Sequence, residues 1–213
     1  MLMVELIGNS GKYASHFEDG DLPRALNHFK NTMLWPIKIS EVPFHLACYF
    51  QERNYSLPTF PRPHRGIDIQ THAGVPIVAP EKSRVVACHP NADNYLANFS
   101  LLGEESKIEY GFIHVDPDSI PEKIRDRTQV DPDQKDIIIE SGEYIGRVGT
   151  WPLDLSDLVN VPKDVLKEFG RSFHHLHLEM CYLPYDMFSM DYLHAGMNDK
   201  NLVNPLSLLQ RLE

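Results

Sequence analysis

Cysteine is scarce in this chain, and no two cysteines have the spacing of a metal-binding or redox motif. The three cysteines, Cys48, Cys88 and Cys181, leave at least one thiol unpaired. That count excludes a fold held together by disulfides and a cysteine-based zinc finger. Cys88 and Cys181 lie in apolar runs, so we expect both to be small buried residues.

Positive charge is also in short supply. The chain has 20 Lys and Arg against 30 Asp and Glu, a formal net charge of −10, and its basic residues form no cluster. Phosphate groups would meet net repulsion on such a surface. The sequence therefore predicts no nucleic-acid partner.

Long hydrophobic runs are absent as well. The longest apolar stretches fall far short of the roughly 20 residues that a membrane-spanning helix needs. The first twelve residues carry Glu5 inside their apolar stretch and have no basic start, which makes them a poor secretory signal. We expect no membrane span, and the sequence leaves the compartment and the oligomeric state open.

The composition is that of a globular protein with a sizeable core, because 42% of the 213 residues are hydrophobic. Residues 1–60 form a partly helical N-terminal extension in our interpretation, and residues 61–213 a second unit. Asp21 and Pro23 are typical of a helix start, and residues 43–52 fit either a helix or a strand. A proline-rich connector follows at 57–63.

From His64 onward the pattern is typical of strands. Short runs rich in Val, Ile, Tyr and Phe, separated by turn residues, occupy 74–80, 83–90, 94–102, 107–116, 135–142, 143–149 and 174–183. We predict a mainly β fold with a few helices, built on an antiparallel sheet or barrel-sandwich core. A short helix is expected at 162–169, ended by Gly170, and a closing helix at 204–209.

Two short patterns carry the chemistry. In His64-Arg65-Gly66-Ile67-Asp68, an imidazole and a carboxylate four residues apart would share one side of a strand, and both are suitable zinc ligands. In residues 175–179 (HLHLE), His175 and His177 would share one face of a strand, with Cα atoms roughly 6.5 Å apart. Each pattern alone also fits an ordinary turn or a half-buried strand.

The order of these patterns, with His114 on a strand between them, resembles the lysostaphin-type (LytM-like) zinc metalloendopeptidases of the duplicated hybrid motif fold. The resemblance covers residues 61–210, about 70% of the chain. It extends to residues 73–79 (AGVPIVA), 142–149 (GEYIGRVG) and 203–206 (VNPL). The family has similar segments in the same order, which makes the match specific.

The resemblance implies an enzyme with one zinc ion per chain that hydrolyses peptide bonds in the stem peptides or cross-bridges of peptidoglycan. His64, Asp68 and His177 would be the zinc ligands, leaving the fourth position to water. His175 would be the general base, and His114 would orient the water or stabilise the oxyanion. The resemblance also implies a site of action in the cell envelope or outside the cell. This contrasts with the first twelve residues, which make a poor secretory signal.

This chain departs from the family in several places. Phe112 replaces a tyrosine, Ser83 replaces a glycine, and about twenty additional residues, 151–173, precede the HLH motif. We also considered a non-catalytic member of the fold that binds peptidoglycan or a protein partner, and a phosphohistidine sugar-transport carrier. The presence of all five site residues favours the enzyme, and Asp68 counts against the carrier.

Overall fold

The computed structural model describes residues 33–38, 41–48, 64–90, 96–127, 136–152, 161, 163–182 and 205. The connector at 57–63 lies outside these residues, as do nearly all of the expected N-terminal and closing helices. Within the described ranges, no helix is long and apolar enough to cross a membrane.

The described residues form a mainly antiparallel β structure, as predicted. The strands are β1 (His45–Cys48), β2 (Ile67–Gln70), β3 (Pro76–Val78), β4 (Ser83–His89), β5 (Ala97–Gly103), β6 (Ile108–Val115), β7 (Ile138–Ile139), β8 (Tyr144–Arg147) and β9 (His175–Tyr182). The helical elements are η3 (Pro117–Ser119), α3 (Glu122–Arg125) and α4 (Lys163–Phe169). The expected helix at 162–169 is α4, and Gly170 follows it with φ +63°, a left-handed end that glycine adopts without strain.

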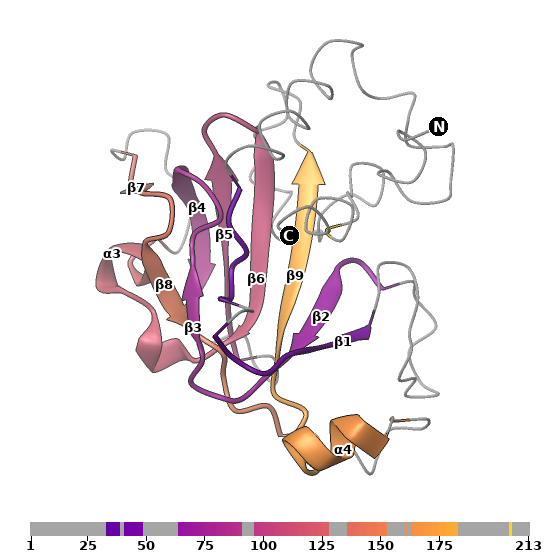
Figure 1. The fold of residues 1–213 in the computed structure, drawn as a ribbon. Coiled ribbons are helices and arrows are strands. Elements are labelled where there is room, and N and C mark those ends of the chain that lie inside the picture. The colour runs from indigo at the N-terminus through magenta and orange to yellow at the C-terminus, as the bar shows by residue number, and fades with distance from the viewer. Residues whose placement is uncertain are drawn as a thin grey trace, which may run out of the picture.

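Seven strands build one sheet in the order β1-β2-β9-β6-β5-β4-β7, and β3 pairs with β8 in a second sheet (Figure 1). The sheet is open in the described part of the chain, so the barrel-like closure that we considered is not seen there. β9 lies between β2 and β6 and pairs antiparallel with both. This order places a segment near residue 177 beside segments near residues 68 and 113, far apart in sequence.

Alternation along these strands separates a core face from a polar face. Ile67 and Ile69 of β2 and Leu176 and Leu178 of β9 are completely buried in the main hydrophobic core. Burying a side chain of this size contributes about 1.5–3 kcal/mol. The residues between them, among them Asp68, therefore point to the opposite face of the sheet.

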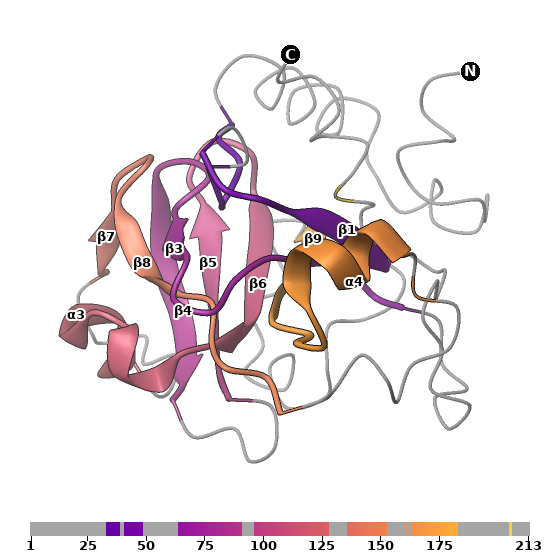
Figure 2. The same ribbon diagram turned by 60° about the horizontal axis from the view of Figure 1, so that its bottom comes forward.

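Residues 33–38 and 41–48 contribute to the same structure. β1 pairs with β2, so the ambiguous stretch at 43–52 contains a strand. Met33 and Ile37 lie in the main core. Ala47 instead packs with Val165 of α4 in a smaller apolar cluster, and Figure 2 shows α4 beside β1 at one end of the sheet.

Candidate metal centre

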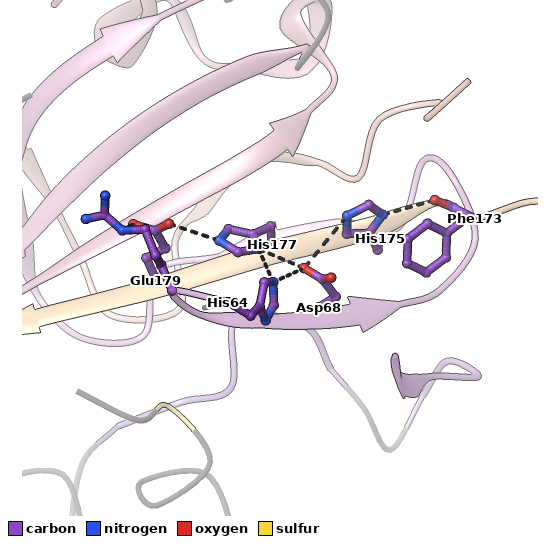
Figure 3. Close-up of polar contacts among 7 residues, drawn as sticks. His64, Asp68, Phe173, His175, His177 and Glu179 are labelled. Atoms are coloured by element: carbon purple, nitrogen blue, oxygen red, sulfur yellow. Dashed lines mark hydrogen bonds and ion pairs between the residues drawn. The ribbon is translucent and has the colours of Figure 1, made fainter. Parts of the chain in front are cut away.

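Three side chains converge at the junction of β2 and β9. His64 Nε2 lies 3.1 Å from Asp68 Oδ1 and 3.0 Å from His177 Nδ1, and His177 Nδ1 lies 2.7 Å from Asp68 Oδ1 (Figure 3). All three residues are buried, and their ligand atoms form a group that can hold a metal ion. The three residues that the sequence predicted as ligands are thus brought into mutual contact.

Strand register explains how Asp68 and His177 meet. The two residues are direct Cα partners in the antiparallel pairing of β2 with β9. Directly opposed residues of an antiparallel pair point to the same face of the sheet. The period-two pattern around residue 177 therefore determines which side chains of β9 face Asp68.

His64 reaches the site by a different route from the one expected. We expected His64 and Asp68 to lie on one strand, but β2 begins at Ile67 and His64 lies before it. Gly66 makes the approach possible, because a Cβ there would lie 2.8 Å from the carbonyl carbon of Leu178 and closer still to its oxygen. Glycine at position 66 therefore lets the chain pass directly over the β9 backbone.

His175 lies beside the three-residue cluster. Its Nδ1 is 3.0 Å from the carbonyl oxygen of Phe173, and its Nε2 is 3.8 Å from Asp68 Oδ1. Because a carbonyl oxygen only accepts, Nδ1 carries the proton and the neutral ring has its lone pair on Nε2. The proton-accepting atom of His175 thus faces the candidate metal centre.

His114 completes the group from β6. Its ring centroid lies 4.4 Å from that of His175 and 6.2 Å from that of His177. His114 has φ +68°, a left-handed conformation that non-glycine residues adopt at a cost of about 1–2 kcal/mol. Such strain persists only when the surrounding structure holds it.

Comparison with known proteins agrees with this architecture. No family model and no curated protein matches the chain. The solved structure of lysostaphin from Staphylococcus simulans is similar with a TM-score of 0.51 and 13% identity, over 84% of this chain and 55% of that chain. The chain therefore has a fold similar to part of lysostaphin.

Other solved structures show weaker similarity. The catalytic domain of lysostaphin matches with a TM-score of 0.47 and 15% identity, over 81% of this chain and 95% of that one. Helicobacter pylori Csd3 matches with a TM-score of 0.44 and 18% identity over 83% of this chain. The chain spans only 32% of the length of Csd3. At these identities the comparison with lysostaphin bears on the fold alone.

On this lysostaphin-like sheet, burial, charged neighbours and hydrogen bonds together determine the charge of each group. Burial would raise the pKa of Asp68, but attraction to His175 and hydrogen bonds from His177 and His64 lower it well below its usual value. Burial would lower the pKa of His177, but its bonds to Asp68 and Glu179 raise it to about 9. Burial outweighs attraction to Asp68 at His175 and lowers its pKa, which keeps that imidazole neutral.

Glu179 supports the site from behind His177. Its Oε1 accepts a hydrogen bond from His177 Nε2 at 3.1 Å, and Arg65 Nε lies 3.7 Å from its Oε2. A carboxylate on the second nitrogen of a ligand histidine is the usual arrangement around protein-bound zinc. The sequence suggested this contact only through the position of Glu179 two residues after His177.

Two aromatic residues that were not predicted from the sequence lie at the site. Trp151 lies with its ring centroid 4.0 Å from that of His114, and Phe173 stacks on His175 at 4.4 Å. Both belong to the additional segment at 151–173, which has no periodic pattern to signal such contacts. The sequence offers only a weak indication of these contacts: an additional segment that contains aromatic residues directly precedes the histidine motif.

Proposed function

We propose that this chain is a zinc-dependent endopeptidase that hydrolyses peptide bonds in the stem peptides or cross-bridges of peptidoglycan. The proposal rests above all on one observation: His175 aims an unprotonated Nε2 at a buried His–Asp–His cluster. That arrangement provides both a metal site and a base beside it.

The three candidate ligands suit zinc. Two imidazole nitrogens and one carboxylate oxygen are typical zinc ligands, with bonds of about 2.0 Å. Tetrahedral coordination at that length separates ligand atoms by about 3.3 Å. The observed separations of 2.7–3.1 Å need only a small expansion to accept the ion. Zinc in such a site polarises a carbonyl group and makes water more acidic.

Two histidines of the protein would carry out the proton transfer and stabilise the reacting groups. His175 Nε2 would accept the proton of the attacking water and later return it to the leaving amine, with its Nδ1 proton held by the Phe173 carbonyl. His114, in contact with the His175 ring, would orient the water or donate to the developing oxyanion. The neutral state of His175 predicts activity at and above neutral pH.

Support for the substrate comes from the resemblance in sequence and fold. Lysostaphin is an antimicrobial peptidase, and the motifs that resemble its family are spread over residues 61–210, about 70% of this chain. A non-catalytic role in binding peptidoglycan or a partner is the alternative. The intact set of five site residues favours hydrolysis.

The test is incubation of the zinc-loaded protein with purified peptidoglycan, followed by mass analysis of the released fragments. We expect fragments that differ from the intact polymer by hydrolysis of one type of peptide bond. Binding of the polymer without release of fragments would contradict the enzyme and favour the alternative.

Two variants test the separate roles. His175→Ala should keep about one zinc per chain and lower the rate about 10²–10⁴-fold, the usual contribution of a general base. His177→Ala should lose both zinc and activity. If His175→Ala lost the metal while His177→Ala kept it, the two roles would be reversed.

A further inference from the structure

Three rings lie against one another beside the metal centre. The indole of Trp151 lies 4.0 Å from the His114 ring, centroid to centroid, with a 52° angle between the planes. It lies 5.7 Å from the His175 ring at 77°. The two histidine rings are themselves 4.4 Å apart at 62°. Tilted and edge-to-face contacts at these distances are the favourable arrangements for aromatic rings.

The backbone around Trp151 is attached to both strands that carry these histidines. Val148 forms a bridge with Val115, and the Gly149 N–H donates to the His114 carbonyl at 2.9 Å. Two residues later, the Trp151 N–H donates to Nδ1 of His174 at 3.0 Å. Trp151 therefore spans from the end of β6 to the start of β9.

His175 has a further aromatic contact, with Phe173. Phe173 stacks on the His175 ring at 4.4 Å with only 26° between the planes. Phe173 also belongs to the small apolar cluster that contains Val165 and Phe169 of α4. Trp151 packs against the same cluster. The ends of the 151–173 segment are thus joined to each other through α4 and to the two histidines.

These contacts restrict rings that would otherwise turn. The left-handed backbone of His114 needs its surroundings to hold it. The Nε2 atom of His175 must keep facing the metal centre, where it now lies 3.8 Å from Asp68 Oδ1. A displacement of about 1 Å in a reacting group can cost about 10²-fold in rate.

We propose that Trp151 is a positioning residue, whose indole holds the rings of His114 and His175 in one orientation at the metal centre. The expected loss of catalytic rate on replacing Trp151 rests on the proposed peptidase function. The expected change in the orientation of the two histidine rings does not depend on that function. The ring contacts of Trp151 are with His114 and His175 and not with the three candidate ligands. Its replacement should therefore change catalysis while leaving metal binding intact.

The kinetic experiment compares Trp151→Leu, Trp151→Phe and a control, Trp35→Phe, in the full-length zinc-loaded protein. We expect Trp151→Leu to lower kcat about 10–100-fold, with KM and zinc content changed no more than about twofold. Trp151→Phe, which restores a ring face, should recover most of kcat. Trp35 contacts Phe44 rather than the histidines, so Trp35→Phe should match the parent protein.

A second measurement detects the rings without any reaction. In nitrogen–proton spectra of the histidine side chains, Trp151→Leu should shift or broaden the His114 and His175 signals and leave those of His64 in place. The spectra decide between the two proposals if the parent protein shows no peptidase activity. A change confined to His114 and His175 would then support the positioning role while the proposed function fails.

Three results would overturn the positioning role. The first is a Trp151→Leu protein with parental ring signals and, where the parent is active, parental kcat. The second is loss of zinc together with a fall in melting temperature, which would make Trp151 a general structural residue. The third is an equal loss in Trp151→Phe and Trp151→Leu, because then the ring face would have no part in the effect.

Discussion

Glu179 and Asp68 bind opposite nitrogens of the same ring. His177 Nε2 lies 3.1 Å from Glu179 Oε1, and His177 Nδ1 lies 2.7 Å from Asp68 Oδ1 (Figure 3). Both carboxylates accept, so the metal-free ring carries a proton on each nitrogen. This explains why its pKa rises to about 9 although burial alone would lower it. Metal binding at Nδ1 must remove one of these protons.

Zinc binding to the metal-free protein should therefore release protons. Below pH 9 the His177 ring of the metal-free folded protein is charged, so we expect release of about one proton per zinc near pH 7. The apparent affinity should rise with pH and level off above about pH 9. Calorimetry in two buffers of different ionisation enthalpy measures the protons released. A release near zero, with affinity independent of pH, would contradict the protonated pair.

The same proton predicts how the metal-free protein responds to pH. The folded-state pKa of about 9 exceeds the value of about 6.5 expected for an unfolded histidine. The stabilisation from this group is thus complete below about pH 6.5 and is lost as pH rises through about 9. Thermal unfolding of chelator-treated protein across this range should show the decline, and His177→Ala should not show this contribution.

Removing the carboxylate behind His177 should weaken the metal site without removing a ligand. We expect Glu179→Ala to lower zinc affinity about 10–100-fold, the usual effect of losing such a supporting group. Competition with a chelator measures the affinity directly. Glu168→Ala, in the exposed part of α4, is the matched control and should bind zinc like the parent. Equal zinc affinity in the two variants would show that Glu179 does not support the ligand.

Much of the β structure could be predicted because its strands carry their own signals. Alternation in residues 175–182 separates His175 and His177 from Leu176 and Leu178, and the structure has the same division between faces. By contrast, residues 43–52 have no clear period, and only pairing with β2 makes His45–Cys48 a strand. Local pattern determines which face a side chain takes, whereas long-range pairing determines which strands meet.

At the candidate site, too, local sequence pattern predicted less than long-range packing determines. The separation of His64 and Asp68 by four residues suggested a shared strand, but His64 lies before β2. The chain between them passes over the backbone of Leu178 at Gly66. The position of Trp151 could not be predicted from the sequence, because its contacts depend on how the chain from β8 returns to β9. Motif order singled out five histidine and aspartate residues that the structure brings together. Tertiary packing determined what surrounds them.

The close passage of Gly66 over β9 predicts a sharp response to substitution. Gly66→Ala would force a Cβ against the Leu178 backbone, which cannot move without breaking the β2–β9 pairing. Overpacking of this kind costs about 1–3 kcal/mol, and the displacement of His64 should reduce zinc content. Unfolding in denaturant and metal analysis give the two readouts. Gly74→Ala is the control, since open space surrounds that position; it should retain zinc despite some backbone strain.

The polar face of the sheet carries another buried acid, which is not one of the candidate ligands. Glu109 of β6 is Cα partner to Cys181 of β9, is only 3% exposed, and its Oε1 has no hydrogen-bond partner in the described part of the chain. Burial raises the pKa of this carboxyl group. The ionised form is therefore less favourable in the folded protein than in the unfolded chain.

Replacing this charge should stabilise the protein in a pH-dependent way. The folded-state pKa of Glu109 is raised, so the parent loses stability as pH rises from about 4.3 through that pKa. Glu109→Gln removes the ionisation, and we expect its melting temperature to exceed that of the parent by a few degrees near pH 8 but by less near pH 4. Thermal unfolding at several pH values measures the difference. Glu105→Gln, at an exposed position, is the control and should show no such trend. A constant or shrinking advantage of Glu109→Gln with rising pH would mean that burial does not penalise this carboxylate.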